Sequence, residues 1–157
     1  MSILILGIGN LLMGDEGVGV HAAWRLQAGP LPPGVSVVDG GTGGFHLLSY
    51  FQDYDTVILI DATMDGGMPG TVSLLEPRYA SDYPRSLSAH DIGLRDLIES
   101  AALLGPLPRT FLVTISVDTV QPTGPALSAP VEAALPRVVE LVSSILDSFP
   151  TAARSQD

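Results

Sequence analysis

The chain has 157 residues, a formal net charge of −10 and no cysteine. This length favours one domain with a core of its own, and the absence of cysteine excludes disulfides, thiol catalysis and thiolate metal sites. Lysine is also absent and the seven arginines are scattered, so we expect neither Schiff-base chemistry nor nucleic acid binding. No apolar run reaches the roughly 20 residues that a membrane span needs, and no signal-peptide pattern is present. We therefore expect a cytoplasmic protein that does not bind membranes, and we take it to be a monomer.

The first half of the chain alternates apolar runs with helical patterns. Ile3–Leu6 predicts a buried strand, because it is a continuous apolar run. Glu16–Gln27 predicts a helix with Trp24 on its apolar face, and Gly29-Pro30 ends that helix. The next expected elements are a strand at Val35–Val38, a short helix at Phe45–Phe51 and a strand at Thr56–Ile60 that Asp61 caps.

The first strand expected in the second half of the chain differs in direction from the other strands. The fourth expected strand, Thr71–Leu75, follows the third after less than a dozen residues, whereas a parallel crossover needs about a dozen or more. We therefore expect this strand to be antiparallel. The remaining expected elements are an irregular surface loop at Pro77–Leu87, a helix at Asp91–Leu104, a strand at Thr110–Ile115 and a helix at Val131–Phe149 with Pro130 near its start.

This alternation predicts a single α/β domain over residues 1–150, followed by a disordered tail at 151–157. The expected fold class is a twisted, mostly parallel five-stranded sheet with helices on both faces. Ligands of such sheets bind beyond the carboxyl ends of the strands. That rule selects the loops after the first three strands, which are Gly7–Glu16, Asp39–Gly44 and Asp61–Gly70.

The loop after the first strand differs from a dinucleotide-binding loop. It carries Gly7 and Gly9, but Leu12 stands where the third glycine of that motif belongs. Asp15 and Glu16 then stand at the expected start of the first helix, whose N-terminus favours anions. Two carboxylates at that point would repel a pyrophosphate and attract a cation. The loop therefore favours a metal ion over a nucleotide.

Because cysteine is absent, a metal site must use carboxylates and the three histidines, His21, His46 and His90. Glu16 follows the first expected strand, Asp61 follows the third, and His90 stands at the entrance of a helix. We expect these three side chains at one edge of the sheet. Two carboxylates and one imidazole form an open set of ligands, suited to a divalent metal with free positions for substrate or water.

Each of these residues also has a purely structural interpretation. Glu16 can serve only to stabilise a helix N-terminus, while Asp61 and His90 can be capping residues. Asp39 can hold ribose hydroxyls in a nucleotide-binding fold, stabilise the tight turn at Gly40-Gly41 or line the pocket. Spacing alone leaves these alternatives open. A serine hydrolase is not expected, because the chain has no Gly-x-Ser-x-Gly elbow.

Five blocks of residues stand in order along nearly the whole chain. They are Gly7-x-Gly9-Asn10-x-Leu12-x-x-Asp15-Glu16-Gly17-x-Gly19-Val20, Asp39-Gly40-Gly41-Thr42 with Gly44, Ile60-Asp61-Ala62 with Pro69-Gly70, Ser88-x-His90 followed by Gly93-Leu94, and Leu127-Ser128-x-x-Val131-Glu132-x-Ala134. In this combination the chain resembles the nickel–iron hydrogenase maturation endopeptidases. That family trims the C-terminal extension from the hydrogenase large-subunit precursor.

The resemblance implies an enzyme whose metal is part of its substrate. The partner would be a [NiFe]-hydrogenase large-subunit precursor already loaded with nickel, and the nickel would position the scissile bond; cadmium or zinc could occupy the same site. The metal-binding and catalytic positions carried over from the family are Glu16, Asp61 and His90. The loop carried over as facing the substrate consists of Asp39, Gly40, Gly41 and Thr42.

The stretch after the fifth expected strand departs from the family pattern. Family members often carry a Gly-hydrophobic-x-Pro stretch there, but residues 114–118 of this chain lack both the glycine and the proline. The departure bears on which precursor is recognised. Two other functions remain open on the sequence: a dinucleotide-binding module that uses Gly7–Gly14 with Asp39 on the ribose, and a non-catalytic interaction protein on the same fold.

Overall fold

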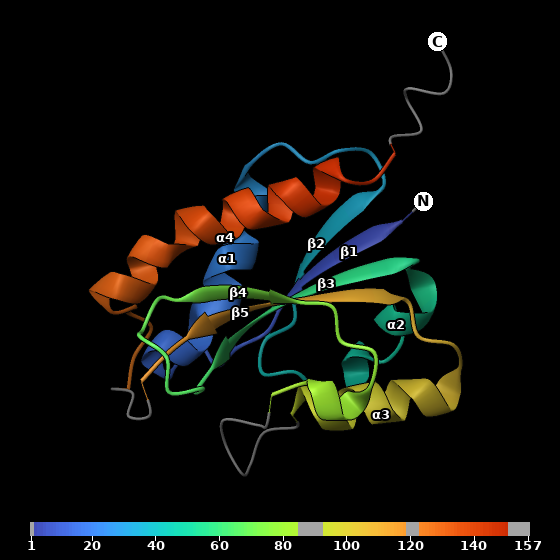
Figure 1. Ribbon diagram of the computed structural model, residues 1–157, viewed down its shortest axis with the longest axis horizontal. Helices are drawn as coiled ribbons and strands as arrows, with labels where there is room; N and C mark the ends of the chain where they lie inside the picture. The colour runs from blue at the N-terminus through green and yellow to red at the C-terminus, as the bar shows by residue number, and fades with distance from the viewer. Residues whose placement is uncertain (1, 85–92, 119–122, 151–157) are drawn as a thin grey trace.

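The computed structural model describes residues 2–84, 93–118 and 123–150, and it places five strands in one sheet (Figure 1). The strands lie in the order β2-β1-β3-β5-β4. β1, β2, β3 and β5 are parallel to one another, and β4 runs antiparallel to β5. Both the mostly parallel sheet and its antiparallel fourth strand confirm the prediction from sequence. The bounds are Ile3–Gly7 for β1, Val35–Asp39 for β2, Thr56–Thr63 for β3, Val72–Leu75 for β4 and Arg109–Ser116 for β5.

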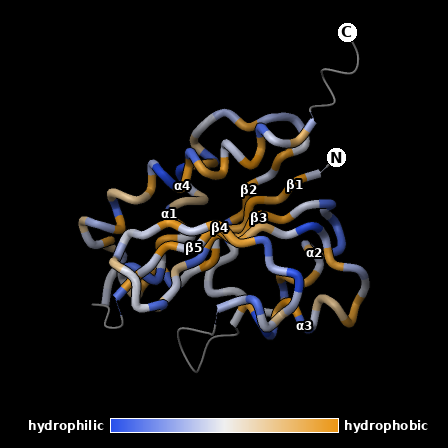
Figure 2. Tube along the Cα trace, viewed as in Figure 1, coloured by the Kyte–Doolittle hydropathy of each residue, from blue (hydrophilic) through white to orange (hydrophobic). Residues whose placement is uncertain are grey.

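Helices cover both faces of this sheet, as expected for the α/β class. Two buried apolar clusters separate the layers, with α1 and α4 packed on one face and α2 and α3 on the other (Figure 1). Figure 2 shows hydrophobic residues concentrated along the central strands between these layers. Among the described residues, no helix has the length and apolar character needed to cross a bilayer. The bounds are α1 Val18–Ala28, α2 Tyr50–Asp53, α3 Leu94–Leu104 and α4 Ala129–Asp147, with short 3-10 turns η1 Gly14–Gly17, η2 Phe45–Leu47 and η3 Ala80–Asp82.

Two helices of the first half differ from the prediction, the first in where it begins and the second in its continuity. The helix expected to start at Glu16 starts at Val18, because the preceding residues form the separate turn η1. The helix expected over residues 45–51 is divided into η2 and α2. Trp24 was expected on the apolar face of α1, but it is 41% exposed, and the face that packs on the sheet carries Ala22 and Leu26 instead.

The third strand is longer than expected. Asp61 does not cap β3, since pairing with β5 continues from Asp61 through Thr63. The loop expected over residues 77–87 contains the turn η3 and a buried tyrosine, Tyr83, in its described part. Burial raises the pKa of this phenol to about 12.

The C-terminal helix is shifted by two residues from its expected position. α4 begins at Ala129 rather than Val131, so Pro130 lies in its first turn, where a missing N–H costs little. The helix continues through Pro136 and ends at Asp147. The expected start of the preceding helix, at residues 91 and 92, and the expected tail at 151–157 lie outside the described residues.

The order of the strands creates a topological switch between β1 and β3. The chain leaves β1 through α1 on one face and reaches β2 on one side. It leaves β2 through η2 and α2 on the other face and reaches β3 on the opposite side of β1. At such a switch the two outgoing loops separate, and a crevice opens beyond the carboxyl ends of the strands. The loops that carry Glu16 and Asp61 leave from these two neighbouring strands.

Glycines let the start of α1 approach the ends of β1 and β3. A Cβ atom added to Gly19 would lie 2.2 Å from the carbonyl oxygen of Ile8 and 2.3 Å from that of Ile60. A Cβ atom added to Gly7 would lie 2.2 Å from the carbonyl oxygen of Gly19. The contact is therefore backbone against backbone, and neither partner has a flexible side chain that could move away.

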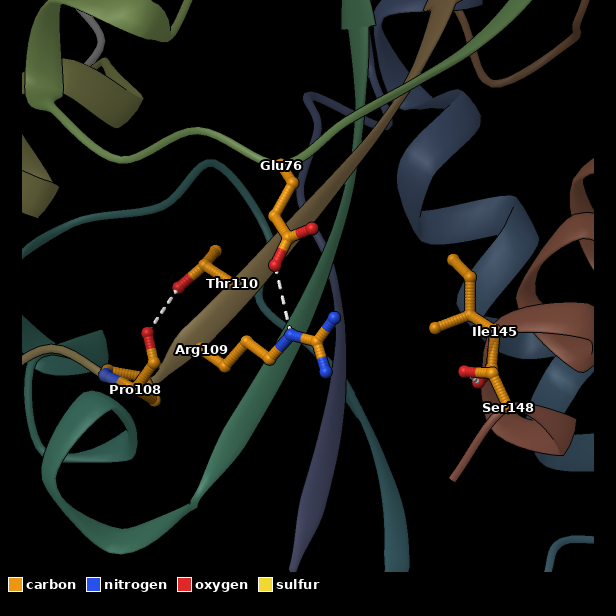
Figure 3. A network of polar contacts seen from close by, with 6 residues as sticks. All are labelled: Glu76, Pro108, Arg109, Thr110, Ile145 and Ser148. Carbon is orange, nitrogen blue, oxygen red and sulfur yellow. Dashed lines mark hydrogen bonds and ion pairs between the residues drawn. The ribbon is translucent and has the colours of Figure 1, made fainter. Parts of the chain in front are cut away.

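Charged contacts lie at the amino end of β5, which is at the edge of the sheet opposite to the carboxyl ends of the parallel strands. Arg109 donates from Nε to Glu76 over 2.9 Å (Figure 3). Its guanidinium also lies 4.8 Å from the ring centroid of Phe111 and 5.6 Å from that of Phe149, which follows α4. These contacts attach the segment after α4 to the amino end of β5.

We predict that Gly19→Ala destabilises the protein although alanine is the better helix former. The expected loss is roughly 3 kcal/mol, at the upper end for overpacking, because two backbone carbonyls must shift. For a chain of this size it corresponds to about 6–12 °C in melting temperature. Gly29→Ala is the matched control, since an added Cβ there meets nothing nearer than 3.8 Å. Equal melting temperatures for the two variants would contradict the close approach.

Candidate functional site

Asp61 lies where β3 extends beyond its neighbour. Gly7, the last residue of β1, pairs with Ile60, so Asp61 is the first residue of β3 past the end of β1. On its other side Asp61 pairs with Thr114 of β5. Its side chain is half-buried, and Oδ1 accepts the N–H of Ala62 over 2.8 Å. The carboxylate therefore stands on a rigid strand at the carboxyl edge.

Glu16 lies in η1, which packs against β3. Only 8% of the residue is exposed. Its N–H donates to the carbonyl of Met13 and its own carbonyl accepts the N–H of Asn10, both over 3.1 Å. The same carbonyl lies 2.3 Å from where a Cβ atom of Gly9 would be, so only glycine allows the loop to close here. The backbone of Glu16 is fixed against the end of β1.

The third predicted ligand, His90, lies outside the described residues. Gly93 is three positions further on and is the N-cap of α3. α3 runs antiparallel to β5, since a short connection joins its C-terminal end to the amino end of that strand (Figure 1). Its N-terminal end therefore points toward the carboxyl edge. Within the described part of the chain, no three His, Asp or Glu side chains gather closely enough to hold a metal ion.

Asp15 does not act as the second acid of a cation site at a helix start. Its Oδ1 accepts the N–H of Ser128 and its Oδ2 accepts the hydroxyl of Ser128, each over 2.7 Å. Ser128 is the N-cap residue of α4, and Asp15 is 4% exposed. The expectation that both acids of Asp15-Glu16 attract a cation is therefore wrong for Asp15, whose carboxylate binds the next helix instead.

The glycine turn after β2 is joined to the loop after β1. Gly40 donates its N–H to the carbonyl of Gly7 over 2.8 Å, and Gly9 donates its N–H to the carbonyl of Gly41 over 2.7 Å. Gly41 has a φ of +57°, a left-handed conformation that favours glycine, and no other atom lies within 4 Å of where its Cβ would be. Thr42 follows as an exposed residue. This turn leaves its outer side open.

Asp39 stabilises this turn, which was one of its three possible roles. Its Oδ1 accepts the N–H of Gly41 over 2.9 Å, and its Oδ2 accepts the indole N–H of Trp24 over 3.2 Å. The ring of Trp24 also contacts that of His21 edge to face, with centroids 5.4 Å apart. Trp24 is therefore exposed because it supports the outside of the turn. Both carboxylate oxygens of Asp39 are in use within the protein.

The dinucleotide alternative requires free backbone N–H groups in the loop after β1. In this structure seven of those N–H groups are bonded within the protein, to the loop itself, to β3, to the glycine turn and to residue 124. These seven are not available to a pyrophosphate. The N–H groups concerned belong to Ile8, Gly9, Asn10, Leu12, Met13, Gly14 and Glu16.

The loop after β3 is held by contacts with residues far away in the sequence. Asp65 accepts the N–H of Gly67 and the hydroxyl of Ser116, both over 2.9 Å. These two bonds, with that from Gly67 the larger cause, hold the pKa of Asp65 below its usual value. Arg137 of α4 donates to the carbonyl of Gly70 over 2.8 Å. The sequence predicts a loop over residues 61–70, but it does not show the partners of Asp65 and Gly70, which lie 51 and 67 positions away.

Comparison with known proteins identifies a family. The family model for hydrogenase maturation protease matches residues 20–145. The hydrogenase 2 maturation protease of Escherichia coli is 33% identical over 146 residues, which cover 88% of this chain and 89% of that protein. The hydrogenase expression/formation protein HoxM of Azotobacter vinelandii is 34% identical over 162 residues, covering 99% of this chain and 77% of that protein.

Solved structures agree with this comparison. The hydrogenase maturating endopeptidase HybD from Escherichia coli superposes with a TM-score of 0.84 at 31% identity, over 94% of this chain and 93% of that one. A hydrogenase 2 maturation peptidase from a Thaumarchaeota archaeon gives a TM-score of 0.73 at 30% identity, over 95% of this chain and all of that one. The family model, the relatives and the solved structures lead to the same conclusion: the chain belongs to the hydrogenase maturation protease family.

Proposed function

We propose that this protein is the endopeptidase that removes the C-terminal extension from the precursor of a [NiFe]-hydrogenase large subunit. The observation that carries the proposal is the pair of acids at the topological switch. Glu16 in η1 and Asp61 in β3 stand on packed elements at the carboxyl edge of the sheet, where α/β proteins bind their ligands. Membership of the maturation protease family supplies the class of reaction.

The proposed ligands of the substrate's nickel are Glu16, Asp61 and His90. Carboxylate and imidazole ligands suit a divalent first-row metal, and three protein ligands leave positions open for groups of the substrate. His90 would come from the segment just before α3, whose N-terminal end points toward this edge.

The nickel of the precursor would serve as the recognition element. A nickel ion held by the precursor and by this trio would fix the position of the scissile bond, and it could polarise the carbonyl or activate a water molecule. The enzyme's part is to supply rigid ligands, since Asp61 stands on a strand and the backbone of Glu16 is fixed by two hydrogen bonds. Cadmium or zinc could bind the same three side chains.

The glycine turn after β2 is proposed to face the incoming substrate. The turn consists of Asp39, Gly40, Gly41 and Thr42, and its bonds to Gly7 and Gly9 place it beside the loop that carries Glu16. The open side of Gly41 leaves room for an extended peptide to approach the backbone closely. A cytoplasmic location and a monomeric state remain predictions from the sequence.

Processing of a nickel-loaded precursor tests the trio. We predict that the wild-type protein shortens its cognate large-subunit precursor and that Glu16→Gln lowers the rate by about two orders of magnitude or more, because it removes a ligand charge at the metal. Asp61→Asn should act in the same way. The readout is the mobility of the precursor on a denaturing gel over time, with precursor lacking nickel as the negative control.

Glu132→Gln is the matched control for this assay. Glu132 forms a half-exposed ion pair with Arg25 over 3.0 Å, and such pairs contribute little, so its rate should equal that of the wild type. Equal rates for Glu16→Gln and wild type would remove Glu16 from the reaction. A wild-type protein that leaves its cognate, nickel-loaded precursor intact would instead favour a non-catalytic interaction protein.

Metal titration tests His90 without the substrate. We expect nickel or cadmium chloride to bind the wild-type protein weakly in calorimetry, since only three of its ligands come from the protein, and His90→Ala to weaken that binding by roughly tenfold or more. His46→Ala is the control, because His46 is exposed on η2 and outside the trio. If His90→Ala and wild type bind the metal equally, His90 is not a ligand.

A further inference from the structure

We propose that Asp15 is a positioning residue for the metal site, a latch that holds η1 against the N-terminal end of α4 and thereby fixes the backbone of Glu16. The inference rests on the proposed function, because Glu16 is taken as a ligand of the substrate's nickel. It adds a role for the first acid of the Asp15-Glu16 pair. In this role Asp15 does not touch the metal.

The contact between Asp15 and Ser128 has the geometry of a specific latch. One carboxylate oxygen takes the backbone N–H of Ser128 and the other takes its hydroxyl, each over 2.7 Å. Such charge-assisted bonds are shorter and stronger than those between neutral groups. Ser128 is also the N-cap of a helix of 19 residues, where the helix dipole favours a negative charge. Asp15 is 4% exposed, so water competes little for these bonds.

The latch is part of a wider attachment, formed by the segment 123–128 that precedes α4. Gly124 accepts the N–H of Gly14 and donates its own N–H to the carbonyl of Leu12, both over 2.7 Å. Pro125 also contacts His21 of α1, with its carbonyl 3.2 Å from Nε2. The segment therefore binds the loop after β1 at Gly124 and at Ser128, and it binds α1 at Pro125. Of the two contacts with the loop, only the one at Ser128 is made by a charged side chain, that of Asp15.

The effect on Glu16 follows from the short length of η1. The turn has four residues and no side-chain cap, so it cannot keep its shape without outside contacts. Glu16 is the next residue after Asp15. Its N–H donates to the carbonyl of Met13 and its carbonyl accepts the N–H of Asn10, so both of these backbone bonds stay within the loop after β1. Release of Asp15 would let η1 move relative to β3. The Glu16 carboxylate would then lose its fixed position at the carboxyl edge of the sheet, although both proposed ligands would remain in the chain.

Three variants distinguish three possible roles of Asp15: a positioning residue, a metal ligand and a residue that only stabilises the fold. Asp15→Ala removes both bonds. Asp15→Asn keeps the shape and can restore both, since its amide oxygen can accept the N–H of Ser128 and its amide N–H can donate to the hydroxyl. Val142→Ala is the stability control: Val142 is fully buried in α4 and packs in the core cluster on that face of the sheet.

The main readout is the affinity of each folded variant for cadmium chloride in calorimetry. We expect Asp15→Ala to bind cadmium about tenfold to a hundredfold more weakly than wild type, the range seen when residues that orient metal ligands are lost. Asp15→Asn and Val142→Ala should stay within about threefold of wild type. Equal losses in Asp15→Ala and Asp15→Asn would make Asp15 a ligand, and equal losses in Asp15→Ala and Val142→Ala would make it merely stabilising. Either result overturns the proposal.

Hydrogen exchange supplies an arm that does not depend on the metal. Asp15→Ala should raise the exchange rates of the Gly14 and Glu16 amides by about tenfold relative to Val142→Ala, because only the first variant frees η1. No difference between the two variants would also overturn the latch.

If the wild type binds no cadmium, the metal site of the proposed function is wrong, and the hydrogen-exchange result alone tests the latch. Where Asp15→Ala does not fold, Ser128→Ala takes its place, because it removes only the bond to the hydroxyl.

Discussion

The close backbone approach of α1 and η1 to the ends of β1 and β3 is the constraint on which the rest of the structure depends. Gly7 and Gly19 bring the helix onto the strands, and Gly9 lets the carbonyl of Glu16 lie against the end of β1. A side chain at Gly7 or Gly19 would push α1 away from the strands, and one at Gly9 would push η1 away from the loop after β1. The glycines after β1 therefore serve packing rather than phosphate binding, and the space beside them is taken by the chain itself.

This packing determines what the carboxyl edge can bind. Seven N–H groups of the loop after β1 that could attract an anion are bonded within the protein, and Glu16 and Asp61 lie on packed elements at the switch between β1 and β3. Our proposal is that this edge binds a cation. A cation carried by the substrate fits an enzyme of the maturation protease family, because cleavage would then depend on a precursor that already holds its metal.

The sequence predicts the architecture of this protein well and the role of several single residues poorly. The alternation of apolar runs with helical patterns predicts the α/β class, because it depends on local sequence pattern. The short link before β4 predicts that this strand is antiparallel, because it depends only on the number of residues in the link. Trp24 and Asp15 were misread because their partners, Asp39 and Ser128, stand 15 and 113 positions away. Hydrophobic periodicity carries no information about a polar contact of that kind. His90 remains a prediction from the sequence and from the resemblance to the family.

In our proposal, side chains from three separate segments meet on one divalent ion at the carboxyl edge of the sheet. The anomalous scattering of cadmium in crystals soaked in cadmium chloride would locate that ion. We expect the strongest anomalous peak within bonding distance of carboxylate oxygens of Glu16 and Asp61 and of an imidazole nitrogen of His90. A strongest peak elsewhere, with these three side chains directed to different regions, would contradict it.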